Sequence, residues 1–282
     1  MEKKVLILGG KGMLGHMLVS YINSLKDYKV YYTLRKEINL KKQEIFFDAY
    51  KNLEEINEII KKIKPILIVN CIGIIKPFVN NNKEKVVFLN SYFPHKINKI
   101  CIEKNIKFIH ISTDCVFSGK KGAYTEESLY SPKDFYGLSK ATGEINNKHN
   151  LTIRTSIIGP ELKKSGVSLM NWLFQQKNNK IKGFKKAIWS GLTTLELSKK
   201  IVEMYEKKVT GLINITSKPI NKYNLLKIIN EVYKLNINID PNNSFYCDRS
   251  MKSIRDDIKY NVPSHNQMII ELKNWTESKK II

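Results

Sequence analysis

The sequence predicts an α/β protein with a doubly wound, mostly parallel sheet and a smaller C-terminal α/β lobe. Three observations support this fold class. A short apolar strand near the N-terminus runs directly into a glycine-rich loop and an apolar helix. Strands and helices then alternate as far as residue 155, as in sheets whose parallel strands are joined by helical crossovers. Beyond Gly159-Pro160 this rhythm changes.

The first strand, Val5–Leu8, is followed by a loop that fits a dinucleotide-binding Rossmann fingerprint, with its first glycine at position 9 or 10. Glycine backbones can turn tightly and approach a pyrophosphate, and the next helix directs its N-terminal amides at the phosphates. The residues of this loop that we expect to bind the cofactor are Gly9, Lys11, Gly12, Met13, Leu14 and Gly15.

The end of the second strand, Lys29–Leu34, favours NADP over NAD. An NAD enzyme usually places an acid there to bind the adenosine ribose. This chain has Arg35 and Lys36 instead, and two cations suit a 2′-phosphate; Lys11 indicates the same. The alternative is a solvated basic turn in a lysine-rich protein. We therefore expect NADPH and leave NADH open.

Further cofactor contacts are expected where later strands end. A strand over Glu44–Asp48 ends in an acid that can reach the adenine, and the buried strand Ile66–Val69 ends where open α/β sheets bind ligands. A long helix over 83–105 carries an asparagine in an apolar stretch, so its side chain should bond to a neighbouring loop. These expected contacts are Asp48, Asn70, Cys71, Ile72, Gly73 and Asn90.

The strand Ile109–Ile111 ends in the polar residues 112–114, and Tyr136 and Lys140 follow further along the chain. Four residues apart on a helix, the phenol and the ammonium share one face. The pattern YxxxK occurs four times in this sequence, so alone it carries little information. Only Tyr136 follows a strand ending in Ser-Thr and opens a helix after a Ser-Pro turn.

These residues can carry out proton transfer. A free tyrosine ionises near pH 10, and a nearby lysine cation should lower the pKa of the Tyr136 phenol. Tyrosine can then donate a proton to a carbonyl oxygen while a hydride reaches the carbon. A hydroxyl from the strand end can hold that oxygen, and the lysine can also bind the nicotinamide ribose. The expected catalytic residues are Tyr136, Lys140, Thr113 and Ser112.

The C-terminal part shows helical patterns near 167–177, 194–207 and 221–235, a short strand over Leu212–Ile215, an expected turn at Pro241–Asn243 and a last amphipathic segment over 264–275. We expect it to close over the carboxyl edge of the sheet. The predicted Rossmann domain comprises 1–160 and roughly 190–216, and the predicted substrate-binding lobe comprises 161–189 and 217–282.

Composition narrows the function. The net charge of +22 raises nucleic-acid binding as an interpretation, but lysine, asparagine and isoleucine are abundant throughout and no tract is intensely basic. We expect no nucleic-acid partner, although the charge can attract an anionic nucleotide. No stretch reaches the roughly 18 apolar residues of a membrane span, and we see no signal peptide. The four cysteines form no CxxC pair. A cytoplasmic protein without metal or membrane is expected, and a homodimer is left open.

The glycine loop, Ser112–Phe117 and Tyr136–Lys140 together resemble the extended short-chain dehydrogenase/reductase superfamily, most closely its dTDP-4-dehydrorhamnose reductase branch. The resemblance covers nearly the whole chain and is most specific over 1–160. It implies an NADPH-dependent reduction of the C4 ketone of a nucleotide-linked 6-deoxyhexose. Tyr136 would be the acid, Lys140 its partner, and Ser112 or Thr113 the anchor of the carbonyl.

Two departures refine that expectation. Related dehydratases carry an Asp-Glu pair after the threonine, but here Cys115 follows Asp114, which favours a reductase. Reductases of this branch often have an aromatic residue after the sixth strand, whereas this chain has Ile157-Ile158. A UDP-linked 2-acetamido-2,6-dideoxy-4-ketohexose is therefore considered beside the dTDP-linked sugar. The expected substrate contacts are Asp114, Ile157, Trp189 and Arg249, of which the last two could instead be a core tryptophan and a surface arginine.

A rival function belongs to another class. The same branch is similar to the regulatory subunit of methionine adenosyltransferase, which keeps the fold and serves a partner enzyme. Such a subunit can retain the tyrosine and the lysine, so sequence motifs separate the two functions poorly. The sequence thus leaves a 4-ketoreductase of deoxysugar and surface-glycan biosynthesis, a non-catalytic NADP-binding subunit, and epimerase chemistry as hypotheses.

Overall fold

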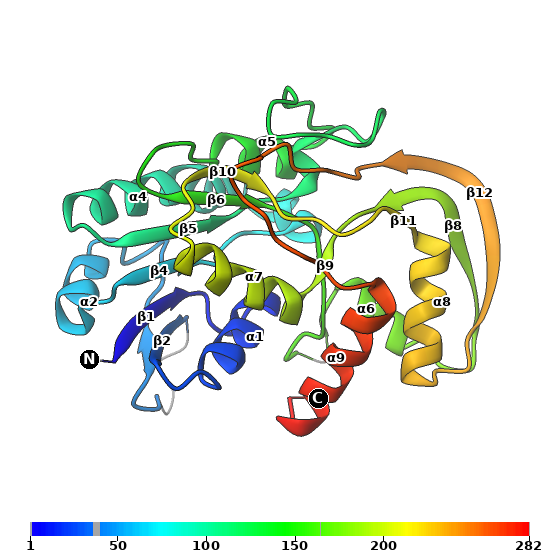
Figure 1. Cartoon of the computed structure of the whole chain (residues 1–282), viewed down its shortest axis with the longest axis horizontal. Helices are drawn as coiled ribbons and strands as arrows, with labels where there is room; N and C mark the ends of the chain where they lie inside the picture. The colour runs from blue at the N-terminus through cyan, green and yellow to red at the C-terminus, as the bar shows by residue number, and fades with distance from the viewer. Residues whose placement is uncertain (1, 36–39, 164, 282) are drawn as a thin grey trace.

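The computed structural model describes residues 2–35, 40–163 and 165–281. Within these residues, seven strands form one sheet in which every pairing is parallel, with helices on both faces (Figure 1). The doubly wound sheet is therefore confirmed. In order across the sheet, the strands are β10 (Gly211–Asn214), β6 (Leu151–Arg154), β5 (Lys107–Ile111), β4 (Leu67–Asn70), β1 (Lys3–Leu8), β2 (Tyr28–Leu34) and β3 (Glu44–Phe46).

The central strands are apolar because both faces of the sheet are covered. In β1, Val5 and Ile7 pack on one face, whereas Leu6 and Leu8 pack on the other, as the alternation of side chains along a strand requires. All four side chains are fully buried. Helices α1 (Met13–Ile22) and α7 (Thr194–Glu206) contribute to the first core, and α2 (Glu55–Ile63) and α4 (Phe93–Glu103) to the second.

The expected long helix over 83–105 is one helical run with an irregular middle. It consists of α3 (Lys83–Val87), a π-helical turn η2 (Phe88–Tyr92) and α4. Asn90 lies in the π-helical turn, and its amide donates to the Ile74 carbonyl at 2.9 Å and accepts from the Ile74 N–H at 2.8 Å. The expected bond between Asn90 and a neighbouring loop is confirmed.

A smaller lobe stands beside the large sheet (Figure 1). Its three-stranded sheet has the order β11-β8-β12, and α8 and α9 share a hydrophobic core with β8. The boundaries between the two parts remain a prediction. The elements of this half are β7 (Ile157–Ile158), α6 (Leu169–Phe174), β8 (Lys180–Trp189), β9 (Leu192–Thr193), β11 (Ile220–Asn221), α8 (Lys222–Tyr233), β12 (Asn238–Asp248) and α9 (His265–Ser278).

The expected turn at Pro241–Asn243 is wrong, because these residues lie inside β12. Proline lacks the N–H that a central strand needs, but β12 is an edge of its sheet and can leave one side unpaired. A shift of register between Asn242 and Tyr246 absorbs the irregularity. The strand β8, which pairs with β12, was also not expected as a long strand.

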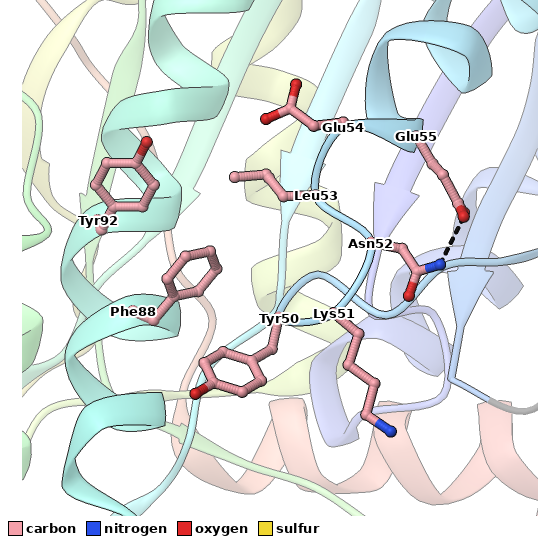
Figure 2. A pocket seen from close by; sticks show the side chains of 8 residues that line it. All are labelled: Tyr50, Lys51, Asn52, Leu53, Glu54, Glu55, Phe88 and Tyr92. Carbon is pink, nitrogen blue, oxygen red and sulfur yellow. Dashed lines mark hydrogen bonds between the residues drawn. The ribbon is translucent and has the colours of Figure 1, made fainter.

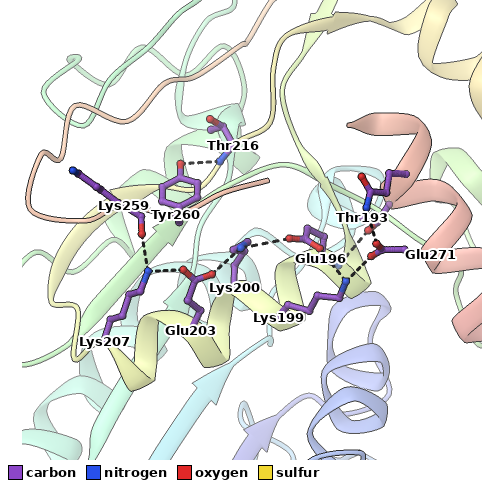
Figure 3. Close-up of polar contacts among 11 residues, drawn as sticks. Thr193, Glu196, Lys199, Lys200, Glu203, Lys207, Thr216, Lys259, Tyr260 and Glu271 are labelled. Carbon is purple, nitrogen blue, oxygen red and sulfur yellow. Dashed lines mark hydrogen bonds and ion pairs between the residues drawn. The ribbon is translucent and has the colours of Figure 1, made fainter. Parts of the chain in front are cut away.

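Ion pairs along α7 connect it to the C-terminal part (Figure 3). Lys199 binds Glu271 of α9 at 2.5 Å, and Lys200 binds Glu203 at 2.7 Å. Lys207 binds Glu203 and also donates to the carbonyl of Lys259 at 2.6 Å. The bonds of Lys199 and Lys207 hold α9 and the segment before it against α7. No helix within the described ranges is long and apolar enough to cross a membrane.

One ion pair is fully buried where β5 and β6 end. The Arg154 guanidinium binds the Glu144 carboxylate with an Nη2–Oε2 distance of 2.7 Å, and the two side chains are 1% and 2% exposed. The same carboxylate accepts hydrogen bonds from Ser112 and Tyr130. Both charges are thus paired and hydrogen-bonded, which a buried ion pair requires.

We predict that Arg154→Met lowers the free energy of unfolding by about 3–5 kcal/mol, because it leaves the Glu144 carboxylate buried without a cation. Urea unfolding followed by circular dichroism measures this loss. The double variant Glu144→Gln/Arg154→Met should recover a large part of it, since the amide keeps an acceptor for Ser112 without a charge. A single variant as stable as the parent chain would contradict this account of the pair.

Candidate active site

The glycine loop has the geometry of the register that begins at Gly9. This residue takes a left-handed conformation, with φ of +87°, and the Gly12 N–H donates to its carbonyl at 3.0 Å. A Cβ at Gly15 would lie 2.1 Å from the Gly9 oxygen, so only glycine allows this approach of the helix to the strand. Helix α1 begins at Met13, and Leu14 packs into the core.

The residues expected at the adenosine end are spread over several elements. Lys11 is paired with Glu44 at 3.4 Å, and Arg35 is exposed. Lys36 lies outside the described residues, so the structure does not test its expected contact with a 2′-phosphate. The carboxylate of Asp48 accepts from the Tyr50 N–H at 3.0 Å, which shapes the turn after β3.

The segment after β4 packs directly against the glycine loop. A Cβ at Gly9 would lie 3.0 Å from Ile72 and 3.3 Å from the backbone of Cys71, and one at Gly73 would lie 3.2 Å from the Asn90 amide oxygen. The side chain of Asn70 fixes this segment by accepting from the Ile72 N–H at 3.0 Å. The predicted cofactor residues of β1, β4 and η2 therefore meet at one edge of the sheet.

Helix α5 (Phe135–Thr142) presents the Tyr136–Lys140 pair beside the end of β5. Asp134 caps the helix by accepting from the Gly137 N–H at 2.9 Å. A Cβ at Gly137 would lie 2.2 Å from the Cys115 carbonyl oxygen, so a glycine is needed for the helix to lie this close to the strand end. Lys140 is buried, and its Nζ donates to the carbonyl of Ile111 at 2.7 Å.

The expected direction of the Tyr136 pKa is wrong. Burial raises the pKa of this phenol, and hydrogen bonding to Thr113 only partly opposes the shift. The lowering expected from the Lys140 cation does not outweigh this burial, because the Lys140 Nζ donates to the end of β5 and burial lowers the pKa of its own amine to about 8. At neutral pH the phenol therefore keeps its proton.

The structure separates the roles of the two neighbouring hydroxyls. Ser112 donates to the buried Glu144 carboxylate, so its hydroxyl is committed to the ion pair with Arg154. Thr113 begins the short 3-10 helix η3 (Asp114–Val116), where its hydroxyl donates to Asp114 at 3.1 Å and accepts from the Cys115 N–H. Of these two hydroxyls, the one of Thr113 faces the phenol.

Asp114 lies between two cations contributed by the C-terminal half. Burial raises the pKa of this carboxyl, while Arg249 and Lys222 oppose the shift. Arg249 donates to the carbonyl of Phe117 at 3.0 Å, so it belongs to the site rather than to the open surface. Lys222, the first residue of α8, was not predicted; its Nζ lies 4.9 Å from the centre of the Trp189 ring.

The other two expected substrate residues, Trp189 and Ile157, are less accessible to a substrate. Trp189 is 3% exposed, belongs to the core of the lobe, and donates from its indole to Ser156 at 2.9 Å. Its contact with Lys222 and its bond to Ser156, which also hydrogen-bonds to Asp114, connect it to the site. Ile157 is partly buried in β7, where it pairs with Leu192.

A separate hollow lies between the turn after β3 and the π-helical turn (Figure 2). Tyr50, Phe88 and Tyr92 form its aromatic side, and the rings of Tyr50 and Phe88 meet edge to face. None of the predicted site residues lines this hollow. The predicted residues that follow β1, β4 and β5 lie instead at the carboxyl ends of these strands.

The fold and the site together define an extended short-chain dehydrogenase/reductase architecture. The family described as the RmlD substrate binding domain matches residues 3–214, and the chain belongs to this family. It is a family of NAD(P)-dependent sugar-nucleotide reductases that also has non-catalytic relatives.

Individual relatives are distant. A dTDP-4-keto-6-deoxy-D-glucose reductase of Streptomyces niveus is 25% identical over 146 residues, covering 51% of this chain and 47% of that protein. The methionine adenosyltransferase 2 subunit beta of Rattus norvegicus is 26% identical over 180 residues, covering 62% and 53%. The chain thus spans about half the length of the curated relatives it matches.

Among solved structures, a dTDP-4-dehydrorhamnose reductase from Bacillus anthracis in complex with NADP superposes with a TM-score of 0.79. The alignment covers 97% of this chain and 99% of that one, at 19% identity. A likeness at this identity shows the fold, and the fold class is confirmed by it.

Proposed function

We propose that this protein reduces the C4 ketone of a nucleotide-linked 4-keto-6-deoxyhexose with NADPH. The observation that carries the proposal is that α5 presents Tyr136 and Lys140 at the end of β5, where Thr113 faces the phenol, with Cys115 where dehydratases have a glutamate. Without that glutamate, the elimination of water lacks its acid/base group. The membership of the chain in a family of sugar-nucleotide reductases supports the same reaction.

The residues present fit a dinucleotide. Gly12 has open space beside its Cα, where a Cβ would meet only the Gly9 oxygen at 3.4 Å. A phosphate could approach the backbone there, at the N-terminus of α1, which attracts anions. Gly9, Met13 and the segment 70–73 would surround the cofactor, with Arg35 and Lys36 at its adenosine end. This end favours NADPH and leaves NADH open.

NADPH, when bound, supplies the hydride. Tyr136 donates the proton to the ketone oxygen, and its raised pKa ensures that the proton is present at neutral pH. Thr113 holds the ketone oxygen beside the phenol. Lys140 stabilises the phenolate that forms, which it can do only while its amine carries a proton.

The cations of the C-terminal half suit an anionic substrate. Arg249 and Lys222 flank Asp114 at the edge of the site, and the two positive charges would attract the diphosphate of a nucleotide sugar. Ile157 would border the sugar. Both a dTDP-linked sugar and a UDP-linked 2-acetamido sugar are compatible with this arrangement.

A second candidate function is a non-catalytic NADP-binding subunit. The likeness to methionine adenosyltransferase 2 subunit beta favours it, because this relative matches a longer stretch than the reductase from Streptomyces niveus. The two functions differ in one measurable property, since only the reductase consumes NADPH in the presence of a ketosugar.

For the cofactor loop, we predict that Gly12→Ala retains the fold but loses NADPH binding. Its φ of −73° suits alanine, so the helix start should lose about 1 kcal/mol at most. The added methyl group would occupy the space that the phosphates need. Thermal unfolding with and without NADPH measures both effects.

The matched variant for that experiment is Gly15→Ala, whose Cβ would collide with the Gly9 oxygen. It should be destabilised even without NADPH. If the stabilisation of Gly12→Ala by NADPH equals that of the parent chain, the loop does not bind the cofactor as proposed.

For the reaction, we predict oxidation of NADPH, followed at 340 nm, with one of two freshly prepared 4-keto-6-deoxy sugars. One is dTDP-linked, and the other is UDP-linked with a 2-acetamido group. Tyr136→Phe keeps the ring and removes the proton donor, so kcat should fall by about 10²–10⁴-fold. If the parent chain binds NADPH tightly but oxidises it with neither sugar, the reductase function is rejected in favour of the regulatory subunit.

The two neighbouring hydroxyls should respond differently to removal. Thr113→Val retains the shape and removes the group that holds the ketone oxygen, so kcat should fall strongly, while the lost bonds to Asp114 and from the Cys115 N–H should cost about 1–2 kcal/mol of stability. Ser112→Ala removes a hydrogen bond to the buried Glu144, so stability should fall by about 1–3 kcal/mol with a smaller effect on kcat. Steady-state kinetics and urea unfolding of both variants test this division. A larger loss of kcat in Ser112→Ala than in Thr113→Val would refute it.

A further inference from the structure

A chain of three buried polar side chains lies behind the tyrosine–lysine pair. Asn70 at the end of β4, His110 in β5 and Lys140 in α5 are 1%, 0% and 5% exposed. The Asn70 Nδ2 lies 3.2 Å from the His110 Nδ1, and the His110 Nε2 lies 3.3 Å from the Lys140 Nζ. A histidine inside a central strand is costly unless both of its nitrogens have partners, and here both do.

The bonds of Asn70 determine which nitrogen of His110 carries the hydrogen. Its amide oxygen already accepts from the Ile72 N–H at 3.0 Å, so its NH₂ group faces the imidazole. An NH₂ group can only donate, and Nδ1 must therefore accept with its lone pair. Burial holds the pKa of His110 well below its usual range, so the ring is neutral and its one hydrogen lies on Nε2.

This hydrogen faces the lysine. A neutral Lys140 amine can accept it while still donating to the Ile111 carbonyl at 2.7 Å. An ammonium has three donors and no acceptor, so it needs a bare Nε2. The hydrogen of His110 must then move to Nδ1, where it meets the NH₂ group of Asn70. Protonation of Lys140 therefore costs one of the two hydrogen bonds made by His110.

We propose that His110, oriented by Asn70, is a positioning residue that couples the tautomer of its imidazole to the presence of a proton on Lys140. No chemistry passes through His110 itself. Its two ring nitrogens face Asn70 and Lys140 rather than Tyr136, so it acts only through the lysine. The consequence for turnover rests on the proposed reductase function, whereas the coupling between the two side chains does not.

Other titratable groups around the pair leave this role to His110. Glu144 favours the ammonium form of Lys140 but is committed to Arg154. Burial raises the pKa of the Cys71 thiol to about 12, so it stays neutral. His95, which faces His110 from α4, bonds through its Nε2 to the Thr142 carbonyl. His110 is thus the neighbour of Lys140 whose hydrogen can change place without a change of charge.

The variant Asn70→Asp tests the coupling with almost no change of shape. One carboxylate oxygen can still accept from the Ile72 N–H. The other replaces the NH₂ group, so it accepts a hydrogen bond from the Nδ1–H of His110, whereas the NH₂ group donates one to Nδ1. His110 then presents a bare Nε2 to Lys140, which favours the ammonium. Full-length protein labelled with ¹⁵N-histidine reports the tautomer directly, and His110→Phe identifies the signals among the five histidines of the chain.

In the parent chain without ligand, we expect Nε2–H above pH 9 and a change toward Nδ1–H as the pH falls through about 8, where Lys140 gains its proton. In Asn70→Asp we expect Nδ1–H throughout this range. An unchanged tautomer in the parent chain across these pH values overturns the proposal, even if the variant does not fold. So does an Nε2–H tautomer in a folded Asn70→Asp.

The pH profile of NADPH oxidation provides an independent readout. Activity should fall as the pH rises through the pKa of Lys140, and Asn70→Asp should move this fall upward by about one pH unit or more. The negative charge of Asn70→Asp would by itself cause part of this upward shift. Asn70→Asp is therefore also combined with His110→Phe, which has no imidazole. A shift of equal size in both backgrounds overturns the role of the tautomer. Absence of oxidation in every variant rejects the reductase function, while the histidine spectra still decide the coupling.

Discussion

The burial of both faces of the parallel sheet is the constraint on which the site depends. Strands β1, β4 and β5 lie in the middle of the sheet and are covered by two cores. Polar side chains can therefore be placed only where these strands end, or inside them with complete hydrogen bonding. The glycine loop, the segment after Asn70 and Thr113 are all strand ends. His110 is the internal exception, and its partners on β4 and α5 connect two of those ends.

The same constraint gives Ser112 and Thr113 different surroundings, although the sequence alone does not distinguish these two neighbouring hydroxyls. Successive residues of an extended chain point to opposite sides. Ser112 points to the side of Glu144 and Arg154 and joins a buried ion pair, whereas Thr113 points to the side of the phenol. One hydroxyl thus joins a buried ion pair, and the next is the one that we propose for the chemistry. Through Ser112, the buried ion pair binds the strand end from which Thr113 would reach the proposed substrate.

Local patterns predicted much of this protein, and the failures have a common cause. The strand–glycine–helix unit, the pair Tyr136 and Lys140 and the bond of Asn90 each depend on residues near in sequence or on a recurring motif. The strand β12 through Pro241 and the cation Lys222 depend on the lobe folding back over the sheet. The direction of the Tyr136 pKa depends on burial, because spacing alone places a lysine near the phenol but does not show where its Nζ points.

The charge of the site follows from burial as well. Lys140 and Lys222 both have their pKa lowered to about 8 by burial, whereas Arg249 keeps its charge at any physiological pH. Below pH 8 both lysines are protonated, so that Asp114 has the two cations Arg249 and Lys222 near it and the end of β5 has the cation of Lys140. As the pH rises above 8, each lysine loses its proton, so that in the proposed reductase the attraction for an anionic nucleotide and the stabilisation of a phenolate would both weaken. In the proposed reductase, substrate binding and proton transfer would therefore depend on the same range of pH, although the two lysines come from different halves of the chain.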